Sequence, residues 1–150
     1  MEQPPFSTDR ALSEYLFRQL AQLEAKINDL QNSIRKNIIM DQWKFTTTTT
    51  DTDPGANYLG INAALKADAT KLYINKHSNT NMDLYDILLN LKIRDIIALS
   101  LASNTTDYAY YYVSGIPIDG TTYIKIPLLK KSTGGAEFAN NAVLNFGVAY

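Results

Sequence analysis

Hydrophobic residues recur at alternating steps of four and three between Leu16 and Ile34, and most positions between them are polar. The members of this stripe are Leu16, Leu20, Leu23, Ile27, Leu30 and Ile34. The spacing is a heptad pattern, with isoleucine at two of three a positions and leucine at every d position. It predicts a helix that buries its stripe against identical helices. The alternative is a single amphipathic helix lying on its own domain, which usually shows a wider apolar face.

The number of helices in this predicted coiled coil stays open. Isoleucine at a with leucine at d is typical of parallel dimers. The segment Gln19-Leu20-Ala21-Gln22-Leu23-Glu24 resembles a short trimerisation motif in which arginine stands at the position of Gln19. Gln19 can donate one hydrogen bond to Glu24 but cannot form the charged bidentate pair. Asn37, at the next d position, either fixes the register or marks the end of the coil.

Three segments follow from the change of pattern along the chain. Residues 1–10 contain Pro4, Pro5 and one large apolar side chain, Phe6, and are expected to be extended. Such a peptide is either a frayed terminus or a segment that orders on a partner. The predicted helix starts near Asp9 and runs to Met40. We therefore divide the chain into 1–10, a coiled-coil helix at 11–42, and a β-rich domain at 43–150.

The β-rich domain begins where the hydrophobic period changes to two, at Trp43-Lys44-Phe45, before five consecutive threonines. Alternating segments bounded by turn residues predict strands at 58–62, 71–76, 94–102, 108–114, 121–130 and 142–150. Residues 83–91 have helical spacing instead and are expected to plug one end of the sheet. The predicted fold is mainly β, with an N-terminal coiled coil followed by an antiparallel β-sandwich or barrel with one short helix.

Tyrosines are concentrated in one predicted strand. Tyr108, Tyr110 and Tyr112 are expected on one face of that strand, with Ala109, Tyr111 and Val113 on the other face. One interpretation is a sheet with half-buried tyrosines whose hydroxyls reach the solvent. The other is a candidate ligand surface made by Tyr108, Tyr110 and Tyr112, because tyrosine supplies contact area at low entropic cost.

Composition removes several classes of function. The 150 residues carry a net charge of −1, which gives no basic surface for nucleic acid or an anionic membrane. The chain has no cysteine, so thiolate nucleophiles and cysteine-ligated metals are excluded. We find no segment long and apolar enough to span a membrane and no signal-peptide pattern at the N-terminus. We expect a soluble protein made in the cytoplasm.

The sequence offers no complete catalytic or metal-binding motif. Residues 51–55 begin like a calcium loop, but Ala56 and Asn62 stand where such a loop needs glycine and glutamate. The single histidine, His77, lies in a predicted polar loop and is expected to be solvated. The carboxylates available for pairing in glycoside hydrolysis are of a kind typical of turns and caps: Asp83, Asp86, Asp95, Asp107, Asp119 and Glu137. We therefore predict no catalytic residue, cofactor or metal, and no enzyme activity.

With these segments defined, the region from Trp43 to Tyr150 resembles the C-terminal β-domain of bacteriophage fibre-type virion proteins. The residues that carry the resemblance are Phe45 with the threonines, Asp53-Pro54-Gly55, Asn62-Ala63-Ala64, Ala69 to Ile74, Leu84 to Leu91, Asp107 to Gly115, and Phe138 with Val143 to Phe146. The N-terminus, Pro4 to Asp9 followed by Leu12 to Leu20, looks like the start of small phage structural proteins.

The resemblance implies a homotrimeric part of a virion. Residues 1–10, with Pro4, Pro5 and Phe6, would anchor the chain to other virion proteins of the tail or capsid, and the helix would form a trimeric stalk. The β-domain would project as a tail fibre or fibre-like component involved in host attachment. Alternatives are a head fibre or decoration protein, or a module that binds a host surface glycan. A small hydrolase acting on surface polysaccharide is the remaining hypothesis.

Overall fold

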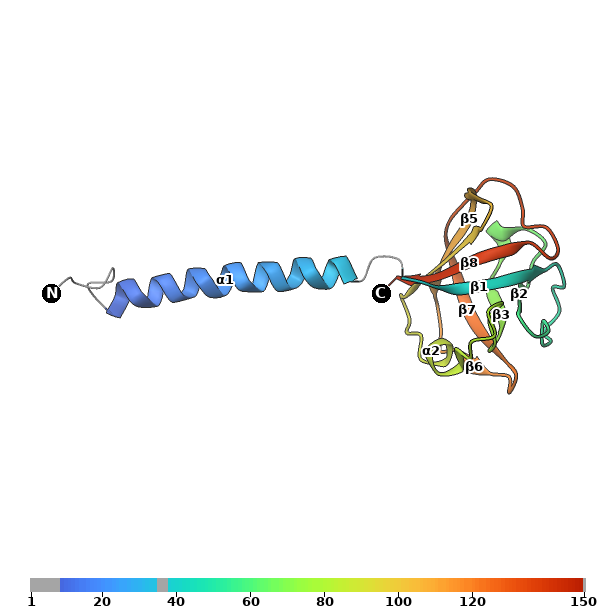
Figure 1. Ribbon diagram of the computed structural model, residues 1–150, viewed down its shortest axis with the longest axis horizontal. Coiled ribbons are helices and arrows are strands. Elements are labelled where there is room, and N and C mark those ends of the chain that lie inside the picture. Colours follow the sequence, from blue (N-terminus) through green and yellow to red (C-terminus); the bar gives the residue numbers. More distant parts are fainter. Residues whose placement is uncertain (1–8, 35–37, 150) are drawn as a thin grey trace. The chain divides into compact units, whose positions relative to one another are not determined.

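The computed structural model describes residues 9–34 and 38–149 and contains two compact units, Met1–Lys36 and Asn37–Tyr150. The first unit contains one helix and the second contains eight strands, a helix and a short 3-10 turn (Figure 1). Their bounds are α1 Asp9–Ile34, β1 Ile38–Thr46, β2 Tyr58–Ile61, η1 Lys66–Asp68, β3 Lys71–Asn75, α2 Tyr85–Leu89, β4 Ile96–Leu101, β5 Asn104–Val113, β6 Ile118–Asp119, β7 Tyr123–Gly134 and β8 Val143–Ala149.

Helix α1 begins at Asp9, as the sequence predicts, but it ends at Ile34 and not at Met40. Residues from Ile38 onward belong to strand β1, so the helical segment does not extend to residue 42. Ile38 pairs with Val148 and Ile39 pairs with Gly147 of strand β8. Two consecutive β-branched residues favour a strand when a partner strand is present. Asn37, proposed as a coil position, lies outside the described residues.

The strands of the second unit form a closed barrel. Their order is β3-β2-β1-β8-β4-β5-β7, and pairing of β3 with β7 closes the circle, while β6 is added to an edge of β7. The barrel, and not the sandwich, is therefore the correct one of the two predicted architectures. Closure removes the exposed sheet edges of these seven strands, which are otherwise sites of unwanted pairing between chains.

One pair of neighbouring strands differs from the antiparallel prediction. Strands β1 and β2 are parallel, with Lys44 opposite Tyr58. Residues 47–57 carry the chain back, so that β2 runs beside the last three residues of β1 instead of folding back as a hairpin. The Asp53 carboxylate holds this connection by accepting hydrogen bonds from the Gly55 amide at 2.9 Å and from the Asn75 side chain at 3.0 Å.

The barrel interior is filled by the inward side chains of each strand, including the single tryptophan, Trp43 of β1. Trp43 is fully buried, packs edge-on against Phe146 at 5.2 Å between ring centroids, and donates a hydrogen bond to the Asn75 carbonyl. Leu84, Leu88 and Leu91, in and around helix α2, belong to the same core. The predicted short helix therefore contributes to the packed interior of the barrel, as helical spacing of leucines suggests.

A lysine takes part in this interior. Lys66, in the turn η1, is almost fully buried, and its ammonium donates hydrogen bonds to the carbonyls of Gly134 and Ala136 at 2.7 and 2.5 Å. The same ammonium lies 4.8 Å from the centroid of the Phe138 ring. Two carbonyls and an aromatic face offset the cost of burying this charge. The Lys66 side chain thus connects η1 to the end of β7 and to the segment that follows it.

Candidate functional site

The helix carries an apolar stripe that nothing in the described part of the chain covers. We call this set the α1 stripe, and its described members are Leu16, Leu20, Leu23, Ile27 and Leu30. Between 45% and 62% of each residue is exposed in the single chain. The side chain of Ile34, the sixth predicted member, lies outside the described residues. Burying the exposed part of each side chain would contribute about 1 kcal/mol per residue.

Phe17 adds to the exposed apolar area beside the α1 stripe. It is 71% exposed, and together with Ser13, Leu16 and Leu20 it lines a shallow depression along the helix. A helix that leaves this much apolar area in water gains free energy when another surface covers it. The α1 stripe is therefore a candidate association surface. The structure of a single chain shows neither a coiled coil nor the number of copies that associate.

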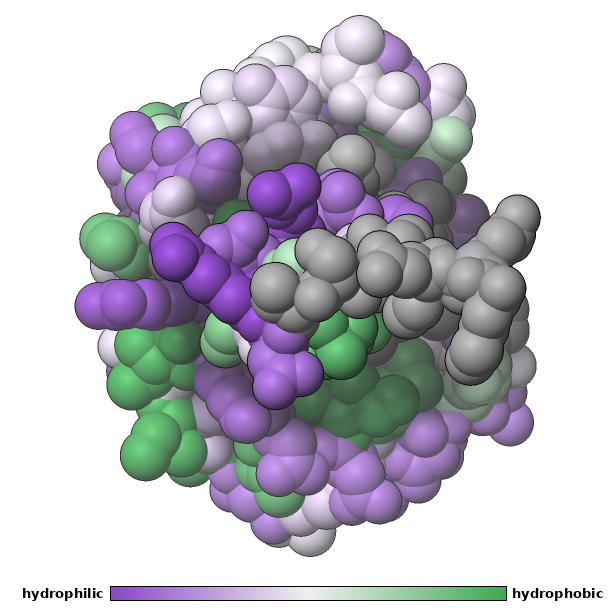
Figure 2. All heavy atoms as spheres, turned by 90° about the vertical axis from the view of Figure 1, so that its left-hand side faces the viewer, coloured by the Kyte–Doolittle hydropathy of each residue, from purple (hydrophilic) through white to green (hydrophobic). Residues whose placement is uncertain are grey.

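The tyrosines of strand β5 divide between the two faces as the sequence predicts. Tyr111 is fully buried with Ala109 and Val113, while Tyr108, Tyr110 and Tyr112 are partly buried on the outer face. The alternation of strand side chains fixes this division. Hydrophobic residues also reach the molecular surface at several places on the face shown in Figure 2, between hydrophilic ones.

Tyr108 and Tyr110 contact each other on the outer face. Their ring centroids are 4.7 Å apart and the rings are inclined by 36°. Tyr108 also lies directly over Gly134 of β7, because a Cβ atom on that glycine would come within 2.5 Å of the Tyr108 ring. The Ser132 hydroxyl lies 3.4 Å from the Tyr108 hydroxyl. This pair of rings forms an aromatic surface that a sugar ring or another protein can contact.

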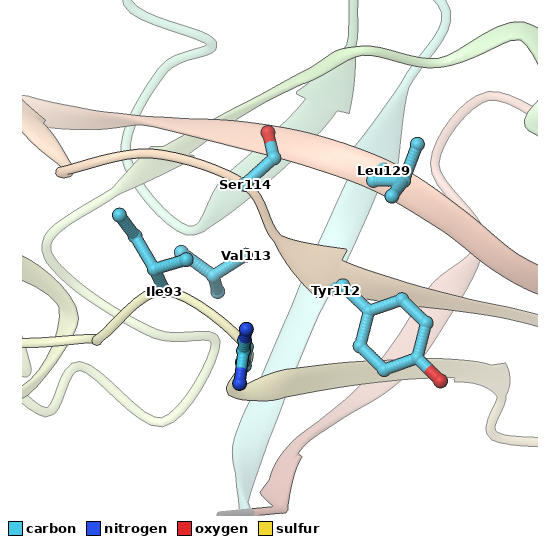
Figure 3. Close-up of a pocket in the computed structure, with 6 residues that line it drawn as sticks. Ile93, Tyr112, Val113, Ser114 and Leu129 are labelled. Atoms are coloured by element: carbon cyan, nitrogen blue, oxygen red, sulfur yellow. The ribbon is translucent and has the colours of Figure 1, made fainter.

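Tyr112 lies in a different environment from the other two tyrosines. It borders an open apolar depression of about 460 Å³, together with Ile93, Arg94 and Leu129. Figure 3 shows Val113 and Ser114 in the same lining, where strand β5 ends. Lys131 lies above the Tyr112 ring at 6.0 Å from the centroid. The three predicted ligand-surface tyrosines are therefore on one face of β5, but Tyr112 belongs to a separate apolar hollow.

The single histidine lies at the edge of the loop that follows β3. Its Nε2 atom is 3.9 Å from Asp83 Oδ2, and 36% of the His77 side chain is exposed. The His77 amide donates a hydrogen bond to Asn75 Oδ1. The neighbouring Ser78 hydroxyl is fully buried and donates to Asp41 instead, at 2.5 Å. His77 therefore does not contact Ser78 as a catalytic base would.

Asp41 holds the loop 78–80 against strand β1. Besides Ser78, its carboxylate accepts hydrogen bonds from the Thr80 hydroxyl and from the Gln42 amide. Burial raises the pKa of Asp41, but the hydrogen bonds from Ser78, Thr80 and Gln42 outweigh burial and lower it. The asparagine of the same loop, Asn79, donates its amide hydrogen to the Gln42 carbonyl at 2.7 Å. The polar groups of this cluster therefore bind one another and hold the loop in place.

The carboxylates considered for hydrolysis are dispersed. Five of the six accept a hydrogen bond that fixes a turn or joins two segments: Asp83 from the Tyr85 amide, Asp95 from the Lys92 amide, Asp107 from the Ala136 amide, Asp119 from the Tyr85 hydroxyl and Glu137 from the Lys66 amide. The Tyr85 hydroxyl and the Thr121 amide lower the pKa of Asp119. Within residues 9–34 and 38–149, no group of three or more histidine or acidic side chains is placed to hold a metal ion.

One functional interpretation of the sequence falls outside the described residues, and the burial of one side chain was missed. Pro4, Pro5 and Phe6, the predicted anchor residues, lie outside the described residues. The burial of Lys66 was not predicted, because a lysine beside Ala67 and Asp68 in sequence carries no sign that it will be covered. None of the described helices is long and apolar enough to cross a membrane.

Comparisons with protein-family models, with curated proteins and with solved structures give no match to this chain. The candidate surfaces are therefore assigned from their own geometry: the α1 stripe on the helical unit, and the outer face of β5 on the barrel.

Proposed function

We propose that the chain is a non-enzymatic structural protein of a bacteriophage particle, a homotrimeric fibre or fibre-like tail-associated component. The observation that supports this most strongly is the α1 stripe, whose five described leucine and isoleucine side chains are about half exposed on a helix that is a unit of its own. An uncovered heptad stripe of this kind is stabilised by packing against copies of itself. A helical segment followed by a β-rich domain is also the layout of the fibre-type proteins that the sequence resembles.

In this proposal, each part of the chain has one task. Residues 1–10 dock on another virion protein, α1 forms a parallel three-stranded stalk, and the closed barrel projects from the particle. The choice of three helices over two in the coil rests on the resemblance and on the motif from Gln19 to Glu24. Isoleucine at a with leucine at d alone favours a dimer. The protein is made in the host cytoplasm and resides in the virion, with no cofactor and no nucleic-acid or membrane partner.

The same architecture suits a head fibre or a capsid decoration protein. Both would use the N-terminal peptide as an anchor and the coil as an oligomerisation device, so the single-chain geometry is identical for a tail or a head position. A low-resolution map of assembled particles, with and without the gene product, distinguishes them by the place where density disappears. Density lost from neither the tail nor the head would contradict a virion role.

The proposed trimer is tested by the solution mass of the full chain and of two variants. Ile27→Asp places a carboxylate in every copy of one a layer, where each buried charge costs several kcal/mol and like charges repel. We expect light scattering to give the mass of three chains for the wild type and of one chain, or a misassembled species, for Ile27→Asp. Gln22→Asp, on the polar side of α1, is the matched control and should keep the mass of three.

Each result has a distinct meaning. A wild-type mass of one or two chains contradicts the homotrimer. A wild-type trimer that survives Ile27→Asp contradicts the role of the α1 stripe and assigns assembly to the barrel.

A second candidate function is recognition of a host surface glycan by the barrel. The specific observation in its favour is the pair Tyr108 and Tyr110, whose adjacent rings lie on the outer face of β5. Aromatic rings of this kind stack on the apolar faces of sugars. Binding on a glycan array that disappears in Tyr110→Ala, with unchanged thermal unfolding, would favour adhesion over a purely structural role. Absence of any binding by the wild-type trimer would remove this candidate.

A further inference from the structure

Four apolar side chains form a patch on the outside of the barrel, contributed by three adjacent strands and the loop before them. We call this the rim patch, and its members are Ile93, Ile96, Tyr112 and Leu129. Ile96 lies opposite Tyr112 in the pairing of β4 with β5, and Tyr112 lies opposite Leu129 in the pairing of β5 with β7. Ile93 and Leu129 are 56% and 61% exposed, and the patch borders the depression of Figure 3.

The alternation of the strands explains why these side chains face outward. The residues next to them in sequence are buried in the barrel interior: Ile97, Tyr111 and Leu128. Ile96, Tyr112 and Leu129 must therefore point to the outside. Contiguous apolar residues on the outside of a β-barrel that is otherwise mixed in polarity mark an interaction site.

The register of the sheet places the rim patch at the end of the barrel where β1 begins. Ile38 is opposite Val148, Val148 is opposite Ile97, and Ile97 is opposite Tyr111. Tyr112, one residue along, therefore lies three strands away from Ile38 in the sheet. With neighbouring strands about 4.8 Å apart, the distance along the sheet is roughly 15 Å.

The connection between the two units limits how far apart neighbouring barrels can be. Three residues, 35–37, separate Ile34 at the end of α1 from Ile38 at the start of β1. A chain of that length spans at most about 14 Å in any conformation. Helices in a coiled coil lie about 8–10 Å apart. Whatever the orientation of each barrel, the Ile38 positions of neighbouring copies then lie within about 40 Å, which is close to the width of one barrel.

We infer that the rim patch is the surface through which each barrel packs against a second copy of the barrel. This inference rests on the proposed association of α1. The surfaces near Ile38 are the parts of the barrels that reach one another first, and the rim patch is an apolar surface near them. In this assembly, Tyr112 is a subunit-contact residue, while Tyr108 and Tyr110 remain on the open face of β5.

The size and charge of the rim patch fit a tethered copy better than a free partner. Four side chains are far fewer than the 20 to 30 residues that each partner contributes to a typical stable interface. Such a small surface is sufficient when a coil holds the copies at millimolar effective concentration. Arg94 lines the same depression, and the Lys131 ammonium lies over the Tyr112 ring, so two cations accompany the apolar side chains.

Thiol labelling of the assembled full chain tests this inference, because the chain has no cysteine of its own. Leu129→Cys places a single thiol in the rim patch. Leu65→Cys is the matched control, because Leu65 is 51% exposed and precedes Lys66, whose ammonium binds the Gly134 carbonyl, five residues along β7 from Leu129. We expect a maleimide to react with Cys at position 129 about tenfold more slowly than at position 65, since thiol reactivity follows exposure.

The combination of mass and labelling separates this inference from the proposed function. A trimer by light scattering with equal labelling rates at the two positions overturns the barrel contact and leaves the helical trimer intact. A mass of one chain overturns both. Protection at position 129 that persists in a single-chain species assigns the rim patch to contacts within one chain and also overturns the inference.

Leu129→Asp in the full chain provides a second, independent readout. Leu129 is largely exposed in the single chain, so a carboxylate there should leave the barrel folded. We expect the melting temperature of the assembled protein to fall further in Leu129→Asp than in Leu65→Asp. Equal melting temperatures in the two variants would contradict a buried contact at the rim patch.

Discussion

The Tyr111 hydroxyl donates a hydrogen bond to the Lys66 carbonyl, 2.8 Å away, in the buried interior of the barrel. This bond joins strand β5, two residues before its end at Val113, to the turn η1, whose Lys66 side chain in turn binds the carbonyls of Gly134 and Ala136. One tyrosine and one lysine therefore connect three segments that are distant in sequence. Because these groups are buried, each needs its partner to avoid an unsatisfied polar atom.

Removal of this hydroxyl should destabilise the barrel. Tyr111→Phe leaves the Lys66 carbonyl without its donor, and we expect the free energy of unfolding to fall by about 1–2 kcal/mol. Tyr110→Phe is the control, because Tyr110 is on the outer face and its hydroxyl has no hydrogen bond among the described residues. Urea unfolding of the two variants and the wild type measures the difference. Equal stabilities of the two variants would contradict a structural role for the bond.

The same tyrosine should make the barrel sensitive to alkaline pH. Burial raises the pKa of Tyr111 well above its usual value near 10, and the negative charge of Glu137 adds to the effect. In the unfolded chain the hydroxyl ionises near pH 10, while in the folded barrel it stays neutral. Stability is therefore full below pH 10 and falls as pH rises beyond it, by up to about 1.4 kcal/mol per pH unit for one group.

A comparison of urea midpoints at about pH 8 and about pH 11 checks this dependence. Tyr111→Phe should lose less stability over that interval than the wild type, because phenylalanine has no proton to release. Tyr110→Phe should behave like the wild type. An alkaline loss of the same size in all three proteins would show that other groups cause it.

Asp53 should be the acidic residue whose loss most weakens the loop between β1 and β2. Its carboxylate accepts hydrogen bonds from the Gly55 amide, the Asn75 side chain and the Thr122 hydroxyl, at 2.9, 3.0 and 2.5 Å. We expect Asp53→Ala to lower the free energy of unfolding by about 2–3 kcal/mol. Asp68→Ala, at an exposed carboxylate, is the control and should change it by less than about 0.5 kcal/mol.

Acid should reduce the contribution of Asp53. Burial raises the pKa of this carboxyl, but hydrogen bonds from Thr122, Gly55 and Asn75 outweigh burial and lower the pKa below its usual 3.8. The contribution is present above pH 3.8 and is lost as pH falls below it. The difference between wild type and Asp53→Ala should therefore shrink in urea titrations at low pH. A difference that grows on acidification would contradict this assignment.

Deletion of residues 1–10 should separate assembly from incorporation. These residues contain Pro4, Pro5 and Phe6 and no core of their own, so we expect the truncated chain to keep its oligomeric mass. It should be absent from particles that are purified after complementation of a virus lacking the full gene. Particles that contain the truncated chain at wild-type level would refute the anchoring role.

Sequence periodicity predicts the parts of this fold that depend on neighbours in the chain. The inward position of Tyr111 and the outward positions of Tyr110 and Tyr112 follow from strand alternation, which needs no knowledge of the partner strands. The start of α1 near Asp9 follows from the capping ability of an aspartate, and the placement of α2 within 83–91 follows from helical spacing.

Closure of the barrel could not be predicted in this way. Pairing of β3 with β7 brings Tyr73 opposite Lys125, and the parallel pairing of β1 with β2 brings Lys44 opposite Tyr58. Such registers depend on the shape of the assembled sheet and on loop lengths, which no local pattern contains. The end of α1 was wrong for the same reason, because strand β8 supplies the partner that turns Ile38 and Ile39 into a strand.

The arrangement of β1 and β8 also determines when the barrel can close during synthesis. Trp43 lies opposite Leu144, so the first strand must wait for a partner that leaves the ribosome about a hundred residues later. Helix α1, by contrast, has only local hydrogen bonds and emerges complete while most of the β-domain is still being made. Each nascent chain therefore exposes its α1 stripe before its own barrel has formed. In the proposed trimer, partner choice at that moment falls to the helix, and the barrels close afterwards.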